Sequence, residues 1–221
     1  MERALVIGAS GGIGSAICSE LQARGADVTG LSRSTHGLDV TQEDSIADCL
    51  APLQPPFDLV FVATGALDIA GHRPEKTLRA LSGQGFADQF AVNCIGPALV
   101  LKHAVRLLPR RDRSVFAALS ARVGSIGDNR LGGWYAYRAA KAALNQVMHG
   151  AAIELRRSHP KAVLALLHPG TVETRFTERY QSSHPTVPAQ TSAKNMLAVL
   201  EQLGPEATGS FHDYAGQEIP W

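Results

Sequence analysis

A tyrosine and a lysine four residues apart, Tyr137 and Lys141, have the side chains and the spacing for proton transfer. They lie in an alanine-rich stretch that predicts a helix, where residues four apart share one face and can point into the same cleft. A phenol titrates near about 10 and is a poor acid or base at neutral pH, but a neighbouring cation favours its phenolate. The pair predicts a tyrosine acid/base assisted by lysine; a surface Tyr and Lys at helical spacing is the simpler alternative.

A glycine-rich segment near the N-terminus indicates a nucleotide site. The apolar run from Arg3 to Gly8 predicts a strand, and the sequence GASGGIG then leads into an amphipathic helix. Glycines let the backbone approach a pyrophosphate, and the helix N-terminus presents unpaired N–H groups and the positive end of the helix dipole. A turn between a first strand and a helix therefore predicts dinucleotide binding. Two glycine patterns fit: Gly8, Gly12 and Gly14 match GxxxGxG, and Gly8, Gly11 and Gly14 match GxxGxxG.

An arginine follows the second predicted strand, Asp27 to Leu31, about 20 residues after the glycines, where an adenosine ribose is expected. An acidic residue there would bind the 2′-hydroxyl of NAD, but this segment is Ser32-Arg33-Ser34. A guanidinium suits a phosphate, so Arg33 predicts a preference for NADP(H) over NAD(H). The alternative is a solvated arginine after a strand.

A proline, Pro97, interrupts the helix predicted from Gly85 to Leu108. A proline within a helix leaves unpaired the carbonyl four residues earlier, and for Pro97 that carbonyl belongs to Asn93. It is then free to hold a water molecule. A kink accommodated by packing is the equally simple alternative.

The remaining elements alternate in the manner of an α/β protein. Buried strands are predicted in LVFVATG, in the run from Ser114 to Leu119 that precedes Ser120, and from Ala162 to Leu167. The segment HPGTVET follows the last of these at its C-terminal end, the side where ligands bind in open α/β sheets. The polar segment from Arg175 to Gln190 is expected to form a mobile flap, and the C-terminal tail an edge strand.

Length and composition limit the classes of protein. At 221 residues the chain is expected to form one domain, residues 1–221. With a net charge of +1 it has no electrostatic signature of a nucleic-acid or membrane partner. Three widely separated cysteines indicate neither disulfides nor a zinc site, and no His-rich spacing predicts a metal. Without a long apolar run or a secretory signal, a cytoplasmic protein is expected.

These motifs, in this order, resemble the short-chain dehydrogenase/reductase family over the whole chain. The landmarks are GASGGIG, the LDV segment with Asp39, VNCIGP with Asn93, the serine strand, Tyr137-x-x-x-Lys141 and HPGTVET. Within the family, the compact length and the run GGWYAYRAAKAALN look most similar to the C-factor and sniffer-like carbonyl reductases. The resemblance implies a doubly wound Rossmann sheet of about seven mainly parallel strands with helices on both faces.

The resemblance also implies roles for individual residues. Tyr137 would protonate the substrate oxygen, Lys141 would lower the pKa of Tyr137 and hold the nicotinamide ribose, and Ser120 would hydrogen-bond the substrate. Asn93 would hold a water that connects Lys141 to solvent. The implied cofactor-binding residues are Gly8, Ser10, Gly12, Ile13, Gly14, Arg33, Asp39, Val40, Gly65, Tyr137, Lys141, Pro169, Val172 and Thr174.

The position of the serine departs from the family pattern. The catalytic serine commonly stands three residues before a glycine, and that position before Gly124 is Ala121. Because strand neighbours point to opposite faces, a shift of one residue matters. Either a loop adjustment keeps Ser120 in place, or Ser125 serves, or the site lacks its serine; Ser120 is favoured. Two polar family positions are also replaced, by Ile7 and by Ala63-Thr64.

The leading hypothesis is an NADPH-dependent oxidoreductase that reduces a ketone or aldehyde, or oxidises the alcohol, with Tyr137 as acid/base. A dinucleotide-binding signalling or sensor protein with little turnover is the alternative from another class. A nucleotide-sugar epimerase relative is disfavoured, because no additional C-terminal substrate domain is present. The expected partners are a small carbonyl or alcohol substrate and, by resemblance, further copies of the chain in a homodimer or homotetramer.

Overall fold

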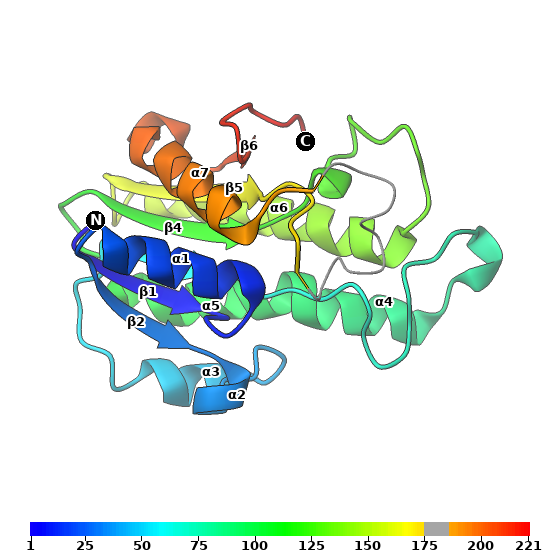
Figure 1. Ribbon diagram of the computed structural model, residues 1–221, viewed down its shortest axis with the longest axis horizontal. Coiled ribbons are helices and arrows are strands. Elements are labelled where there is room, and N and C mark those ends of the chain that lie inside the picture. Colours follow the sequence, from blue (N-terminus) through cyan, green and yellow to red (C-terminus); the bar gives the residue numbers. More distant parts are fainter. Residues whose placement is uncertain (175–185) are drawn as a thin grey trace.

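A computed structural model describes residues 1–174 and 186–221. Most of the flap expected from Arg175 to Gln190 lies outside the described residues. The described part is built on one sheet with helices on both faces, as the alternating sequence pattern predicts (Figure 1).

The sheet has six strands in the order β2-β1-β3-β4-β5-β6, and every neighbouring pair is parallel. The expected doubly wound Rossmann architecture is confirmed, but the expected count of about seven strands is wrong for the described residues. The backbone N–H groups of Leu38 and Asp39 bond to Ser32 and Ser45 instead of to a strand beside β2, so the sheet ends there. The strands are β1 Arg3–Ile7, β2 Asp27–Leu31, β3 Leu59–Val62, β4 Ser114–Leu119, β5 Ala162–His168 and β6 Ser210–Asp213.

Helices cover both faces because alternate residues of the buried strands point to opposite sides. On one face α1 (Gly12–Ala23) and α7 (Ala189–Gln202) pack against the sheet. On the other face lie α3 (Glu43–Leu50), α5 (Gly96–Ala104) and the long α6 (Tyr135–Leu155). The shorter helical segments are α2 (Arg33–His36), α4 (Gly83–Phe90) and the 3-10 turns Leu78–Ala80, Val105–Leu107, Arg122–Gly124 and Pro205–Ala207.

The helix expected from Gly85 to Leu108 forms, but it contains a π-helical turn at Ala91–Ile95 between α4 and α5. Gly96 N–H donates to the carbonyl of Ala91, five residues earlier. Single π turns within α-helices occur frequently at functional sites. This one holds Asn93, whose side chain is completely buried.

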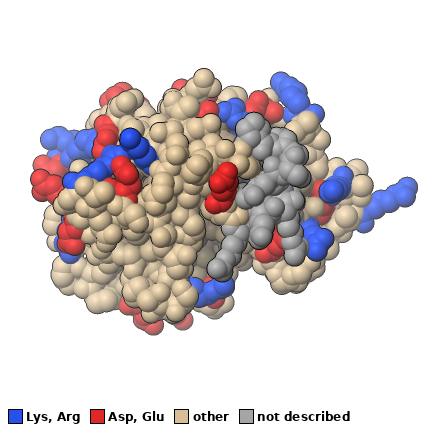
Figure 2. Space-filling view, viewed as in Figure 1, with Lys and Arg blue, Asp and Glu red and all other residues tan. Residues whose placement is uncertain are grey.

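The run Gly83–Leu107 is 25 residues long, with a hydropathy of 1.2 in its most apolar window, so it meets a length-and-composition criterion for a membrane span. Val100, Ala104 and Leu107 of this run are fully buried against the sheet, as expected of a core helix. On the face shown in Figure 2, acidic and basic side chains are intermixed around the margins and no patch of a single sign covers the centre.

The start of α6 is shaped by three successive residues with left-handed backbone, Gly132, Gly133 and Trp134. Positive φ is uncommon for a bulky residue, so the conformation of Trp134 (φ 52°) must be held by its surroundings. Glu75 does this: its carbonyl accepts the N–H of Trp134, and its buried carboxylate accepts the N–H of Ala136 at 3.2 Å. The segment before α4 therefore caps the helix that carries Tyr137.

Candidate active site

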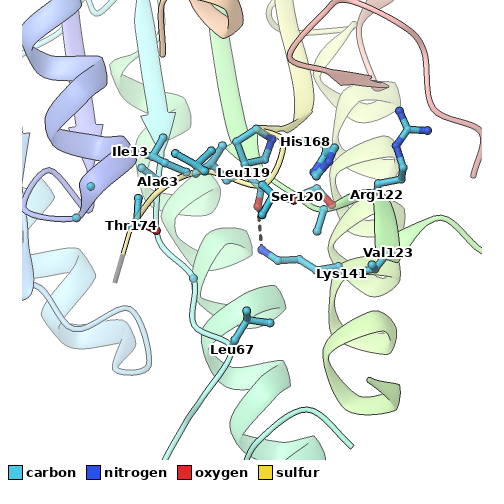
Figure 3. Close-up of a pocket in the computed structure, with 18 of the residues that line it drawn as sticks. Ile13, Ala63, Leu67, Leu119, Ser120, Arg122, Val123, Lys141, His168 and Thr174 are labelled. Atoms are coloured by element: carbon cyan, nitrogen blue, oxygen red, sulfur yellow. Dashed lines mark hydrogen bonds between the residues drawn. The ribbon is translucent and has the colours of Figure 1, made fainter. Parts of the chain in front are cut away.

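A cavity of about 900 Å³ opens at the C-terminal ends of the strands. The glycine-rich turn after β1 lies at one end, and the loop between β4 and α6 lies at the other. In Figure 3, Ile13 and Thr174 are on one side, Arg122 and Val123 on the opposite side, and Ser120 and His168 between them. In open α/β sheets, ligands bind in the crevice at the carboxyl ends of the parallel strands, and the cavity lies at that edge of this sheet.

Tyr137 and Lys141 both line the cavity and are both buried, with 5% and 2% of their surface exposed. Lys141 Nζ lies 5.9 Å from the centre of the Tyr137 ring and donates a 2.9 Å hydrogen bond to the carbonyl of Leu119. Their helical spacing and β4 together bring the two groups into one cleft.

Burial dominates the electrostatics of this pair. It raises the pKa of the Tyr137 phenol well above its ordinary value, whereas Lys141 was expected to lower it. Burial also lowers the pKa of Lys141 from 10.5 to about 7, with a small opposing contribution from Cys94. The raised pKa keeps the phenol protonated but makes it a weaker acid than a free tyrosine, whereas the lowered pKa brings the titration of Lys141 near neutral pH.

Ser120 lines the cavity beside this pair and Ser125 does not. Ser120 is buried directly after β4, where its N–H donates to the carbonyl of Leu167. The Ser125 hydroxyl instead donates to the carbonyl of Pro220 at 2.5 Å and accepts the N–H of Asp128. Ala121, three residues before Gly124, also lines the cavity and packs in one cluster with Tyr137, so the choice of Ser120 as the active-site serine stays a prediction.

Asn93 lies behind the cavity wall and not in its lining. Its amide bonds both backbone groups of Ala66, accepting the N–H at 3.2 Å and donating to the carbonyl at 2.8 Å. It also donates to Gln89 Oε1 at 2.7 Å. Asn93 therefore fixes the segment after β3 to the π turn; its role in holding a water stays a prediction.

The glycine-rich turn has the shape that a dinucleotide requires. Gly8 has a φ of 87°, and a Cβ on Gly14 would lie 2.2 Å from the carbonyl oxygen of Gly8, so both positions need glycine. A Cβ on Gly12 would lie 2.5 Å from Thr174 Cγ2, which places the segment after β5 against the turn.

Among the residues that the structure describes, two that line the cavity have buried polar atoms without a hydrogen-bond partner, Thr64 Oγ1 and His168 Nδ1. Such atoms are costly unless a partner supplies the missing bond. The glycine cradle and these atoms fit a polar nucleotide cofactor.

The structure brings together ten of the residues singled out from the sequence. They line the cavity and are Ser10, Gly12, Ile13, Gly65, Ser120, Tyr137, Lys141, Pro169, Val172 and Thr174. Those outside its lining are Gly8, Gly14, Arg33, Asp39, Val40 and Asn93. Gly8 and Gly14 shape the turn, and Arg33 is exposed at the start of α2. Asp39 accepts two hydrogen bonds from Thr41, which lower its pKa, and Val40 packs against Gly96.

Three residues of this region were not singled out from the sequence. Asn145 accepts the Ser120 hydroxyl, Arg138 lines the end of the cavity beyond Tyr137, and His168 lies beside Ser120. The sequence could have indicated Asn145, because this residue lies four residues after Lys141 and therefore on the same helical face. Burial, helped by the nearby Arg122 and opposed by Asp213, lowers the pKa of His168 to about 4.

In the part of the chain that the structure describes, no group of three or more His, Cys, Asp or Glu side chains could hold a metal ion.

Comparisons with known proteins agree with this geometry. A family model described as Enoyl-(Acyl carrier protein) reductase matches residues 8–203. A protein of Rhodococcus sp. (strain AD45), 1-hydroxy-2-glutathionyl-2-methyl-3-butene dehydrogenase, is 31% identical over 239 residues, covering 100% of both chains. The C-signal protein of Myxococcus xanthus is 38% identical over 146 residues, covering 64% of this chain and 84% of that one.

Among solved structures, a short-chain dehydrogenase/reductase from Burkholderia multivorans with bound NADP is similar at a TM-score of 0.86. It is 28% identical, and the match covers 100% of this chain and 99% of the other.

Proposed function

Because this chain belongs to the short-chain dehydrogenase/reductase family, we propose that it reduces a ketone or aldehyde with NADPH, or oxidises the corresponding alcohol, with Tyr137 as acid/base. The observation that carries the proposal is the lining of one cavity by Ser120, Tyr137 and Lys141 together with the glycine-rich turn. A proton donor, a cation and a cofactor cradle around one space are what carbonyl reduction requires.

NADP(H), when bound, supplies or accepts the hydride. The chain's own residues do the remaining chemistry. The Tyr137 phenol gives its proton to the substrate oxygen, Ser120 hydrogen-bonds that oxygen, and the Lys141 ammonium stabilises the negative charge left on the phenolate. Burial raises the pKa of the Tyr137 phenol, so at neutral pH the residue is protonated, the form that can donate a proton to the substrate oxygen. The Rhodococcus relative is named as a dehydrogenase of an alcohol that carries a glutathionyl group, so alcohols belong in the substrate panel.

The preference for NADP(H) rests on Arg33. The N–H groups of Gly8 and Ala9 donate to the carbonyl of Leu31 at 2.8 and 3.1 Å, so the glycine turn is joined to the end of β2. Arg33 follows two residues later and is exposed, as a guanidinium that binds a ribose phosphate must be. The Burkholderia structure contains NADP, which agrees with this preference.

The proposed assembly is a homodimer or homotetramer in the cytoplasm. Apolar side chains are exposed on the helical run through α5 and on α6, where Ile95, Val147 and Ile153 are 48%, 40% and 56% exposed. Light scattering measures the assembly directly.

The three cysteines Cys18, Cys49 and Cys94 are free, which suits a reducing compartment.

The decisive experiment measures oxidation of NADPH by absorbance across a panel of ketones and aldehydes, and the reverse reaction with alcohols. Tyr137→Phe keeps the ring and removes the proton, so it should nearly abolish turnover while the Kd for NADPH stays unchanged. Full turnover in this variant would refute the mechanism. Nucleotide binding without turnover on any substrate would favour a sensor instead.

A further inference from the structure

We propose that the substrate carries an anionic group, a carboxylate in its simplest form, which binds Arg138 and Arg130 at the end of the cavity farthest from the glycine-rich turn. This inference rests on the proposed function and adds a substrate class to it. The features that support it are that both arginines line the cavity and that, among the described residues, no carboxylate pairs with either.

Arg138 follows Tyr137 directly, and its side chain runs back along α6 toward the loop after β4. Its Nε donates to the carbonyl of Gly133 at 2.9 Å and one terminal nitrogen donates to the carbonyl of Val123 at 3.3 Å. Three of the five guanidinium N–H groups therefore remain available to a ligand. Two neutral carbonyls orient the guanidinium without neutralising it, and within residues 1–174 and 186–221 no carboxylate pairs with it.

Arg130 and Arg122 also line the cavity and differ in their partners. Arg122 is neutralised, because it bonds Asp128 at 3.2 Å and the buried Asp213 at 2.8 Å. Arg130 is exposed, and the described residues offer it no ion pair. Asp128 of this loop and Asp213 of β6 are thus paired with Arg122, and within the described residues no ion pair compensates Arg130 or Arg138. An anion within reach of both guanidinium groups would gain from each.

The opposite end of the cavity belongs to the cofactor. Gly12 faces Thr174 there, and Glu173, which accepts the hydroxyl of Thr186, lies on the same segment. The Tyr137 ring lies against Trp134, with ring centres 6.2 Å apart. A substrate with its reacting oxygen at Tyr137 would extend away from the cofactor along Leu131 and Trp134, an apolar wall, to reach the guanidinium groups. The geometry therefore fits a molecule with an oxygen function, an apolar middle and an anionic end.

Arg138 has an alternative, purely structural role, since its two backbone hydrogen bonds connect the loop after β4 to α6. Loss of that role would disturb the loop for every substrate. Loss of anion recognition would affect only substrates that carry a charge. A matched pair of charged and neutral substrates separates the two roles.

The experiment uses straight-chain aldehydes of several lengths that end in a carboxylate, each beside its methyl ester, with NADPH oxidation as the readout. The best acid should have a kcat/KM at least about 10-fold above its ester, in the range that a charged hydrogen bond gives. Arg138→Gln should remove about 10- to 100-fold of kcat/KM for the acid and less than about 2-fold for the ester, and Arg130→Gln a smaller part. Arg111→Gln, at an exposed arginine before β4 and outside the cavity lining, is the matched control and should change neither.

Equal kcat/KM for acid and ester at every length, or an equal loss for both in Arg138→Gln, would overturn the inference.

A second readout tests the inference separately from the proposed function. Calorimetric titration of the NADP⁺-saturated protein with straight-chain dicarboxylates and their diamides should show binding of the dicarboxylates alone, lost in Arg138→Gln. If this binding occurs but no aldehyde is reduced, the proposed function fails and the inference stands. If turnover occurs and the dicarboxylates bind no better than the diamides, the inference fails.

Discussion

The Ser120 hydroxyl donates a 2.6 Å hydrogen bond to Asn145 Oδ1, and 3% and 2% of the two residues' surfaces are exposed. The amide nitrogen of Asn145 is buried without a partner. In this arrangement the serine proton points away from the substrate oxygen. An amide turned by 180° would donate to Ser120 Oγ and release the serine proton to the substrate, so the orientation of Asn145 decides which way Ser120 can act.

The two serines should differ sharply in their effect on turnover. Ser120→Ala removes the hydroxyl that is proposed to hydrogen-bond the substrate oxygen once Asn145 releases its proton, and should lower kcat by about 10²- to 10³-fold. Ser125→Ala removes a contact with Pro220 and should change kcat by less than about 3-fold. Steady-state kinetics with NADPH at saturation makes the comparison. A larger loss in Ser125→Ala would move the serine role to that residue.

Asn145→Leu should lower kcat by about 10-fold, since it removes a hydrogen bond that orients the serine. In a Ser120→Ala background the same change should have almost no further effect, because the group it acts on is gone. Asn145→Asp should cost more than Asn145→Leu, since a carboxylate accepts the serine proton and cannot donate. Additive losses in the double variant would show that Asn145 acts on something other than Ser120.

The reductive kcat/KM should fall as the pH rises through about 7, the pKa to which burial lowers Lys141. The reductive kcat/KM falls with rising pH because the ammonium is the active form of Lys141, and the ammonium exists below that pKa. The titratable neighbours of Lys141 are the Cys94 thiol and the Tyr137 phenol, and burial raises the pKa of both. Lys141→Arg, which stays charged, should be slower and should lose the fall. A fall at the same pH in that variant would assign the titration to another group.

His168 should make the protein sensitive to acid. The folded state holds its pKa at about 4 against an ordinary 6.5, so between these values the unfolded chain binds more protons. Stability from this group is complete above about 6.5 and is lost as the pH falls toward 4, by at most about 3 kcal/mol. His168→Gln should flatten the decrease in Tm between pH 7 and pH 5. An unchanged decrease would mean that other groups cause the acid sensitivity.

Arg33→Ala should lower kcat/KM for NADPH by about 10- to 100-fold and leave that for NADH nearly unchanged, because only NADPH carries the ribose phosphate. Parallel assays with both cofactors test this, with Arg24→Ala, directly after α1, as a control that removes an arginine bonded to Glu20 and Glu201. An equal loss with both cofactors, or a wild-type preference for NADH, would contradict the assignment.

Local patterns were sufficient to predict the strands, the glycine-rich turn, the helix that carries Tyr137 and Lys141, and the edge strand in the tail. Each depends on residues close together in sequence, such as the four-residue spacing of Tyr137 and Lys141. The count of strands was wrong, because whether the chain after β2 extends the sheet depends on side-chain hydrogen bonds such as that from the N–H of Asp39 to Ser45.

The parts of the site that the sequence did not predict depend on contacts between distant residues. Glu75 caps a helix that begins 60 residues later, at Tyr135, and Ser125 is engaged by Pro220 near the C-terminus. The pKa of Tyr137 could not be foreseen either, since the spacing shows a nearby cation but not how completely the phenol is buried. From the sequence alone Arg138 looks like a surface arginine, because its hydrogen bonds to the carbonyls of Gly133 and Val123 become apparent only in the structure.

The π turn at Ala91–Ile95 limits how the protein can be engineered or can diverge. Deleting one residue within it would give a continuous α-helix, the arrangement that helix stability alone would select. Because the π turn fits one extra residue into about one helical turn, the deletion would keep α4 and α5 nearly in register but would remove the wider turn that holds Asn93 between Gln89 and Ala66. Insertions and deletions should therefore be tolerated in the exposed loops and eliminated here, so that among homologous sequences the length of this helix should vary less than its composition.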